Sequence, residues 1–288
     1  MQTLILSGDL TGKVLVPIIK QKNGDFRSSY FGQTWNLKTE DEIKDFERKL
    51  ENAGAYSLRC GPELVEELKL DEKKVEETMR GLMIERIKDW LNLLLAKVDT
   101  KKIQTIVMPG NDDDLAIDKA IQAFETQGII YPLDKVVMIE DYEMVSLDYV
   151  TPTPWDTPRE TDERGLKRMA EEKILKIKDM KKAIFNFHDP PINTKIDLAP
   201  KLGKDMRLIA GLDGVKFVHV GSKAIREVIE KYQPLLGLHG HIHESSGFEY
   251  IGKTLCLNPG SEYGEGLLRG YIIELKDGKV ENYWKIQG

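Results

Sequence analysis

The residues of this 288-residue chain with the clearest chemical potential are its histidines, all five of which lie between positions 188 and 243. His239, His241 and His243 occupy alternate positions, and Gly240 interrupts them. Alternate side chains of an extended segment point the same way, so neighbours two apart can converge on one face. Imidazole is the commonest metal ligand in proteins. The spacing favours metal binding by His241 and His243 and a structural role for His239; a structural histidine cluster is the alternative.

Four apolar segments of the sequence each lead to a residue that can bind metal. Short apolar runs bounded by Gly or Pro are typical of buried strands, and ligand sites in open α/β sheets form beyond the carboxyl ends of strands. We therefore expect the four segments to deliver their ligands to one sheet edge. The segments are Thr3–Leu6 before Asp9, Ile103–Met108 before Asn111, Ala183–Phe187 before His188, and Leu235–Leu238 before His241 and His243.

These ligands lie within short motifs that follow one another along the chain. The motifs are Gly8-Asp9, Gly110-Asn111-Asp112-Asp113, His188 and Gly240-His241-Ile242-His243. In order and spacing they resemble the motifs of the calcineurin-like metallophosphoesterases, as does the later segment from Asn258 to Ser261. The resemblance implies an α/β sandwich in which two facing mixed β-sheets are flanked by helices. It also implies hydrolysis of a small phosphoester with one or two divalent transition metal ions.

The resemblance further implies a role for each ligand. Asp9 would bridge two ions, His243 would bind the first ion, and Asn111, His188 and His241 would complete the site of the second. Mixed carboxylate, amide and imidazole ligands suit Mn²⁺, Fe²⁺ or Zn²⁺ better than Ca²⁺. Such ions would polarise a phosphoryl group and generate hydroxide for in-line attack.

The start of the chain departs from the family's pattern. The family opens with a D-x-H motif that supplies ligands to the first ion, whereas no histidine precedes His188 here. Asp9 and His243 alone are too few for tight binding of that ion. We therefore expect one occupied site in this chain, and a start codon assigned too far downstream.

Asp112 is the second departure, because the family has a histidine at this position that assists the leaving group. The position makes Asp112 the candidate catalytic residue. An aspartate cannot donate positive charge, and losing a general acid typically costs about 10²-fold or more. The resemblance therefore favours a phosphodiesterase over a phosphomonoesterase. The alternatives are helix capping by Asp112 and Asp113 and, for the whole chain, a catalytically weak or inactive metallophosphoesterase-like scaffold for protein binding.

The composition is that of an ordinary globular protein and excludes several classes. A net charge of −6 provides no basic footprint for nucleic acid. The two cysteines, Cys60 and Cys256, form no CxxC pair, which fits a reducing compartment. No apolar run reaches the roughly 18 residues of a membrane span, and the N-terminus lacks a signal-peptide pattern. These features predict a soluble cytoplasmic protein and give no indication of its oligomeric state.

The pattern along the chain predicts a single domain over residues 1–288 with a helical insertion at about 36–98. Apolar residues at helical spacing between Leu82 and Leu95 favour a packed insertion over a lid. The proline-rich segment 151–160 predicts an irregular loop. Further helices are expected at 114–127, 163–181 and 222–232, the last capped by Ser222, and β-hairpins are expected to turn at 252–253 and 277–278.

Overall fold

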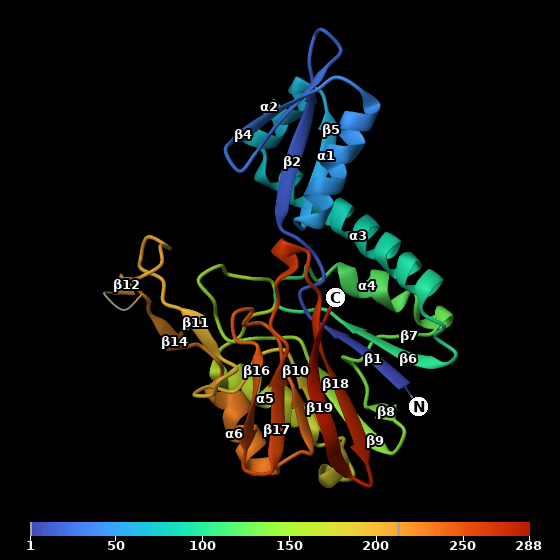
Figure 1. Ribbon diagram of the computed structural model, residues 1–288, viewed down its shortest axis with the longest axis vertical. Helices are drawn as coiled ribbons and strands as arrows, with labels where there is room; N and C mark the ends of the chain where they lie inside the picture. The colour runs from blue at the N-terminus through green and yellow to red at the C-terminus, as the bar shows by residue number, and fades with distance from the viewer. Residues whose placement is uncertain (1, 212–213) are drawn as a thin grey trace. The chain divides into compact units, whose positions relative to one another are not determined.

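The computed structural model describes residues 2–211 and 214–288 (Figure 1). Within these ranges the chain divides into two compact units. One unit contains the segment ending at Leu10 together with Leu95–Glu262 and Leu267–Gly288. The other contains Thr11–Leu94 and Tyr263–Gly266. Because the predicted ligands all fall in the first unit, we call it the ligand-bearing unit and the other the inserted unit.

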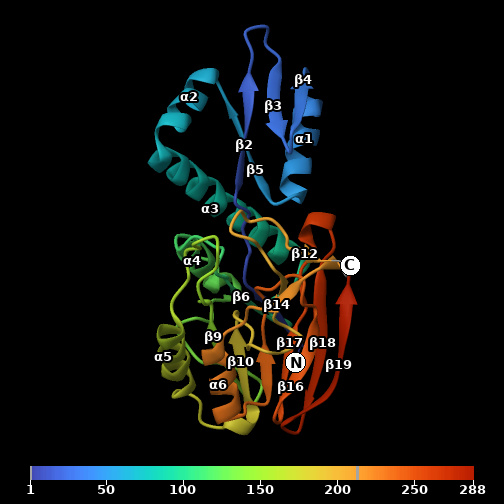
Figure 2. The same cartoon turned by 90° about the vertical axis from the view of Figure 1, so that its left-hand side faces the viewer.

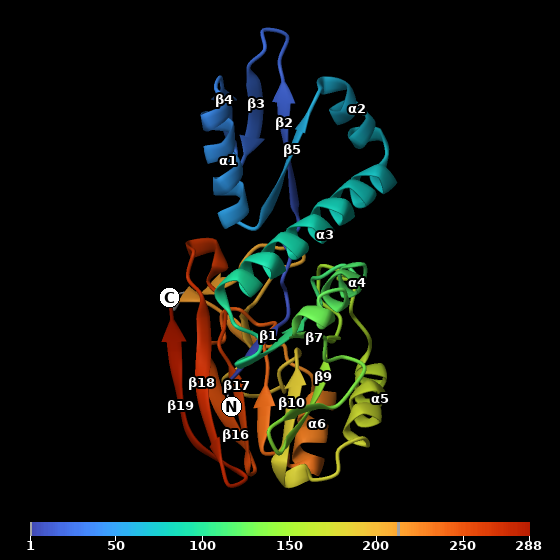
Figure 3. The same cartoon turned by 90° about the vertical axis from the view of Figure 1, so that its right-hand side faces the viewer.

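The ligand-bearing unit is built around a mixed sheet in the order β16-β17-β15-β10-β9-β8 and a parallel sheet in the order β1-β6-β7. A long hairpin of β18 (Arg269–Lys276) and β19 (Lys279–Gln287) runs alongside β16 and β17 (Figure 3). The sheet strands are β1 (Gln2–Ser7), β6 (Ile103–Met108), β7 (Ile129–Ile130), β8 (Val137–Ile139), β9 (Tyr142–Leu147), β10 (Ala183–Phe187), β15 (Leu236–Leu238), β16 (Gly247–Ile251) and β17 (Thr254–Asn258). The α-helices are α4 (Ile117–Gln122), α5 (Glu163–Ile174) and α6 (Lys223–Tyr232).

The two sheets face each other across one core, and helices cover the outer face of the mixed sheet (Figure 2). The core between the sheets contains Ile106 of β6 and Ile184 of β10. Phe185 and Phe187 point to the other face of β10, where they pack with α5 and α6. Each such buried side chain contributes about 1.5–3 kcal/mol. The predicted α/β sandwich of facing sheets flanked by helices is confirmed, although the smaller sheet is parallel and not mixed.

The helix ends of this unit follow the local sequence. Ser222 Oγ accepts a hydrogen bond from the Ile225 backbone N–H at 3.1 Å, so Ser222 caps α6 as predicted. The hairpin turns at 252–253 and 277–278 are also confirmed. Asp277 and Gly278 both have positive φ, as a tight two-residue hairpin turn requires. The helices expected at 114–127 and 163–181 are shorter, since α4 and α5 end at Gln122 and Ile174.

The inserted unit is an α/β structure: the segment 36–98, predicted as a helical insertion, contains α1, α2 and α3 but also the strand β5, and the strands β2 and β3 precede it. Its sheet has the order β4-β3-β2-β5, and α1 covers one face through Ile43 and Phe46. Strands such as β3 and β4 carry exposed polar residues, so they lack the apolar runs by which buried strands are recognised. The elements are β2 (Val14–Lys20), β3 (Phe26–Tyr30), β4 (Gln33–Leu37), α1 (Glu40–Asn52), β5 (Ala55–Cys60), α2 (Pro62–Leu70) and α3 (Glu72–Lys97), whose last residues join the ligand-bearing unit.

The ligand-bearing unit also contains two short antiparallel pairs and the 3-10 helices η1 (Glu125–Gln127) and η2 (Met180–Lys182). β11 (Leu198–Pro200) pairs with β14 (Phe217–His219), and β12 (Ala210–Gly211) pairs with β13 (Gly214–Val215). None of the helices in the described residues is both long and apolar enough to cross a membrane.

Candidate metal centre

The predicted ligands emerge at the carboxyl ends of two pairs of parallel strands. β1 and β6 end in register, and the Gly8 N–H donates to the Met108 carbonyl at 2.8 Å, so Asp9 and Asn111 leave the parallel sheet side by side. β10 and β15 are also parallel neighbours, and His188 and the histidine-rich segment follow them. The strand-to-ligand pattern is confirmed, but the expectation of one sheet edge is wrong. The site lies where the edges of two facing sheets meet.

A buried polar contact holds the two sheets together beneath the ligands. Ser7 Oγ at the end of β1 donates to Asn186 Oδ1 of β10 at 2.8 Å, and Asn186 Nδ2 donates to Ser146 Oγ at 3.0 Å. Asn186 is fully buried. Leaving a buried amide unpaired costs about 1–3 kcal/mol, so these bonds favour one spacing of β1 and β10. The positions of Asp9 and His188 depend on that spacing.

Asp9, His188 and His241 converge on one point. One ligand atom of each lies within 4.8 Å of the other two, which allows a common cation. The closest pair is His188 Nε2 and Asp9 Oδ2 at 3.1 Å. His243 Nε2 lies 3.7 Å from the same carboxylate oxygen. The structure therefore brings three of the other four predicted ligands, His188, His241 and His243, around Asp9, and His243 is more exposed than His188.

Two glycines allow the backbones at this site to approach each other. A Cβ on Gly8 would lie 2.2 Å from Nδ1 and Cε1 of His188, and Gly8 has a φ of +94°. A Cβ on Gly110 would lie 2.4 Å from both the backbone nitrogen and Oδ1 of Asp9. Neither position has room for a side chain. Close packing therefore explains why glycine precedes both Asp9 and Asn111. The glycine at position 110 also allows Asn111 to lie next to Asp9.

His241 reaches the site through a tight turn and not through strand alternation. β15 ends at Leu238, and the Ile242 N–H donates to the Gly240 carbonyl at 2.6 Å. His241, between them, has a φ of +63°. Such a three-residue turn with positive φ is rare and strained, and strain of this kind gathers at functional sites. The expected convergence of His241 and His243 is present, but its predicted cause is wrong.

Asn111 offers an oxygen suited to a cation. Its side chain is buried, and Oδ1 has no hydrogen-bond partner within residues 2–211 and 214–288. Buried polar atoms without a partner are uncommon and indicate an unfilled role. Divalent ions readily accept amide oxygens beside carboxylate and imidazole ligands. The residues present thus fit a divalent cation held by Asp9, Asn111, His188 and His241, with His243 at the rim.

The charges at the site suit the same donor set. Burial would raise the pKa of the Asp9 carboxyl, but His188, His243 and His241 together hold that pKa well below its usual range. Burial lowers the pKa of His241 to about 3, with a further contribution from the His188 charge. Burial also acts against a charged His188, but the Asp9 carboxylate raises the His188 pKa. An ionised carboxylate and a neutral imidazole are the forms that bind metal, so Asp9 and His241 already have the required form, whereas His188 would release its proton when a metal binds.

Asp112 and Asp113 do not cap a helix, so that alternative is wrong. The first turn of α4 has Ala116 at its cap position, without a side-chain hydrogen bond. Asp113 is fully buried, and its Oδ2 accepts hydrogen bonds from the Gly110 and Leu10 N–H groups at 2.8 and 3.0 Å. Asp112 donates its backbone N–H to Asp9 Oδ1 at 3.1 Å. Both residues therefore tie the Asp9 and Asn111 loops together.

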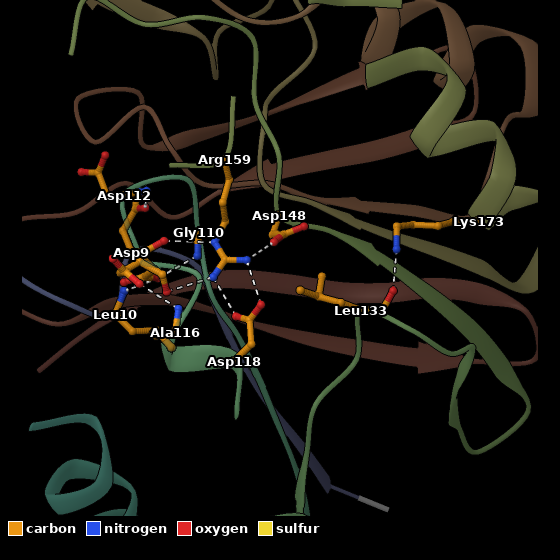
Figure 4. Close-up of polar contacts among 12 residues, drawn as sticks. Asp9, Leu10, Gly110, Asp112, Ala116, Asp118, Leu133, Asp148, Arg159 and Lys173 are labelled. Carbon is orange, nitrogen blue, oxygen red and sulfur yellow. Dashed lines mark hydrogen bonds and ion pairs between the residues drawn. The ribbon is translucent and has the colours of Figure 1, made fainter. Parts of the chain in front are cut away.

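Arg159 is a structural centre of the site that the sequence did not reveal (Figure 4). Its side chain is almost fully buried and pairs with the carboxylates of Asp148 and Asp118, each at 2.7 Å. It also donates to the backbone carbonyls of Asp113 and Asp114 at 3.1 and 3.3 Å. The loop that follows Asn111 is thereby fixed from behind. Arg159 lies in the segment predicted only as an irregular loop, and the nearest partner of its side chain in sequence is eleven residues away.

His239 is structural, as predicted. It is buried, and its Nδ1 lies 2.8 Å from the Phe187 carbonyl and 3.1 Å from the Asp189 carbonyl. Burial lowers the pKa of His239 to about 4, so the ring is neutral at physiological pH. The imidazole thus connects the segments on either side of His188 to the end of β15.

No family model matches the chain. The chain is 31% identical over 160 residues to the uncharacterized protein MJ1162 of Methanocaldococcus jannaschii, a match that covers 54% of this chain and 64% of that protein. The chain therefore spans less than two thirds of the length of this relative.

Similarity to solved structures concerns the fold alone. One crystal structure aligns over 88% of this chain and 92% of its own, with a TM-score of 0.51 and 17% identity. The protein TT1561 of Thermus thermophilus aligns over 65% of this chain and 72% of its own, with a TM-score of 0.40 and 17% identity. The sulfate thiohydrolase SoxB of the same organism aligns over 85% of this chain and 41% of its own, with a TM-score of 0.38 and 15% identity.

Proposed function

We propose that this chain is a metal-dependent hydrolase of phosphoesters, with diesters preferred over monoesters. The observation that carries the proposal is the convergence of Asp9, His188 and His241 on one point, with an unpaired Asn111 oxygen from the loop after β6. The motif order that resembles the calcineurin-like metallophosphoesterases supports the same conclusion. The ligand chemistry favours Mn²⁺, Fe²⁺ or Zn²⁺.

Each residue contributes a defined part. A divalent ion bound here would polarise a phosphoryl oxygen and supply hydroxide near neutral pH. Asp9, Asn111, His188 and His241 hold that ion, and His243 extends the site on its exposed side. The backbone N–H of Asp112 fixes the Asp9 carboxylate. The Asp112 carboxylate, in the position of the family's histidine, brings no positive charge to a leaving group.

The preference for diesters follows from this last point. A monoester leaving group and its doubly charged phosphoryl group gain most from a nearby cationic acid. A diester carries less charge, so it depends less on such a group. We therefore expect turnover of an activated diester such as bis(4-nitrophenyl) phosphate to exceed that of 4-nitrophenyl phosphate.

The test is hydrolysis of these two compounds in the presence of Mn²⁺, with Asp9→Ala and His188→Ala as controls. The proposal predicts diester turnover by the wild type and a loss of at least about 10²-fold in either variant. Turnover that both variants retain would refute it. Faster monoester than diester hydrolysis would refute the substrate preference and leave the metal site intact.

A scaffold for protein binding is the second candidate, and the aspartate at position 112 is the observation that favours it. Such a scaffold has no need to bind metal stoichiometrically. A chain that binds no divalent ion and hydrolyses neither compound would therefore support the scaffold, whereas metal-dependent turnover excludes it.

A further inference from the structure

The orientation of the Asn111 side chain determines whether it can serve as a ligand. An amide carries an oxygen and a nitrogen of similar size, and only its hydrogen-bond partners decide which way it points. Asn111 Nδ2 lies 3.0 Å from Thr157 Oγ1 and 3.1 Å from Asp112 Oδ1. Each of the two N–H bonds thus has an acceptor. Asn111 Oδ1 therefore points away from Thr157 and Asp112. It is buried and has no hydrogen-bond partner in the part of the chain that the structure describes.

The Thr157 hydroxyl can only accept from Asn111, because its own hydrogen is already committed. Thr157 Oγ1 lies 2.6 Å from Glu160 Oε1, and a carboxylate is an acceptor without a donor. The Thr157 backbone N–H also donates to this oxygen, at 2.8 Å. Burial would raise the pKa of Glu160, but hydrogen bonds from Thr153 and Thr157 lower it, so the carboxylate is ionised at neutral pH.

All donors in this series of hydrogen bonds point the same way: the Asn111 amide donates to the Thr157 hydroxyl, and the Thr157 hydroxyl donates to the Glu160 carboxylate. If the Asn111 amide turned over, its oxygen would face the Thr157 oxygen with no hydrogen between them. A buried pair of acceptors of this kind costs about 1–3 kcal/mol. Thr157 is buried, so water does not readily replace the missing donor.

The segment that carries Thr157 and Glu160 is itself held firmly. The Val150 N–H donates to the Arg159 carbonyl, and the Thr161 N–H donates to the Val150 carbonyl, both at 3.0 Å. Arg159 is anchored to Asp148 and Asp118 (Figure 4). Glu160 and Thr157 are therefore held in a fixed position next to Asn111.

We propose that Thr157 is a positioning residue which, with Glu160 behind it, directs Asn111 Oδ1 toward the cation. This inference rests on the proposed metal site but goes beyond it, because neither residue is a ligand. Partners that orient a metal ligand in this way typically contribute 10–100-fold to metal affinity. The irregular loop 151–160 thereby acquires a function in the site.

Thr157→Val tests the inference, since it removes the hydroxyl and keeps the side-chain shape. Thr153→Val is the matched control: the Thr153 hydroxyl donates to the same Glu160 oxygen at the same 2.6 Å, but Asn111 donates to Thr157. Thr157→Ser restores the hydroxyl. The measurement is the Kd for Mn²⁺ alone by isothermal titration calorimetry, together with the Tm of each metal-free variant.

The inference predicts a 10–100-fold weaker Kd for Thr157→Val, and less than about threefold change for Thr157→Ser and Thr153→Val. It also predicts that Thr157→Val loses more Mn²⁺ affinity than a decrease in its metal-free Tm can explain. The affinity and Tm of Thr153→Val show how much affinity is lost through stability alone. Wild-type affinity in Thr157→Val, or an equal loss in Thr153→Val, would overturn it. Wild-type protein that binds Mn²⁺ without hydrolysing a phosphoester would overturn the proposed function alone, and wild-type protein that binds no Mn²⁺ would overturn both.

Discussion

Replacement of Arg159 by methionine should be among the most damaging single changes outside the ligands. The Arg159 side chain is 1% exposed and Asp148 is 4% exposed, so this ion pair lies in the interior. Removing one partner of a buried pair typically costs about 3–5 kcal/mol, because the remaining charge has no compensation. Arg159 also holds two carbonyls of the loop after Asn111. We therefore expect the free energy of unfolding of Arg159→Met to fall by about 3–5 kcal/mol.

The pH dependence of this loss follows from Asp148. Burial already raises the pKa of Asp148, and Arg159 is the largest opposing influence. Without Arg159 the folded-state pKa rises further above the unfolded value of about 4. A carboxyl whose pKa is raised in the folded state binds more protons there than in the unfolded state, so stability falls as pH rises above about 4. The deficit of Arg159→Met should be larger at about pH 8 than at about pH 5.

Urea unfolding of the metal-free protein at both pH values measures these effects. Arg168→Met is the control, because Arg168 is 75% exposed and lies 3.9 Å from Glu172, so its loss should change stability by less than about 0.5 kcal/mol. Arg159→Met combined with Asp148→Asn should recover at least about 1 kcal/mol, since the unpaired charge is gone. A deficit under about 1 kcal/mol for Arg159→Met, or one that is the same at both pH values, would refute this reasoning.

Three further perturbations test the packing and the site. Gly8→Ala should weaken Mn²⁺ binding at least about tenfold, because its Cβ would overlap His188. Gly24→Ala is the control, since Gly24 has a similar φ of +91° but open space around its Cβ, and it should bind Mn²⁺ normally in the same titration. Mn²⁺ at about 100 times its Kd should raise the unfolding free energy by about 2.7 kcal/mol, and a chelator should remove the gain; unchanged thermal unfolding would contradict a folded-state site. Ser222→Ala should cost about 1 kcal/mol in urea unfolding through loss of the α6 cap, and a change below about 0.3 kcal/mol would argue against the cap.

Much of the fold could be predicted because local sequence determined it. Apolar runs such as Ile103–Met108 and Ala183–Phe187 correspond to β6 and β10 residue for residue. Ser222 marked the start of α6, and Asp277-Gly278 marked a hairpin turn. In each case a few neighbouring residues supply the physical cause, whether burial on both faces, a capping oxygen or a positive φ.

The remaining features depend on contacts between distant residues. Sequence did not show that β1 and β10 lie in different sheets, because that depends on which distant strands pair: β1 pairs with β6, and β10 pairs with β9 and β15. It placed His241 on an extended strand, whereas Gly240 allows a turn that only packing selects. Arg159 and Thr157 gave no signal at all, since each acts on Asn111 or its loop from 46 positions away.

The candidate site shows the same division. Residue types and motif order identified Asp9, His188 and His241, which the structure brings together. The orientation of Asn111 and the fixed loop behind it could not be predicted, because they arise from hydrogen bonds that the fold creates. Whether Asp112 takes part in catalysis remains a prediction.

Metal content per chain tests the central claim most directly. Equilibration with Mn²⁺, removal of free ion and elemental analysis should find about one tightly bound ion per wild-type chain and essentially none in Asp9→Asn or His188→Ala. His219→Ala, whose histidine pairs with Asp197, should keep its ion. Wild-type protein without bound metal, or metal that persists in both ligand variants, would contradict the account.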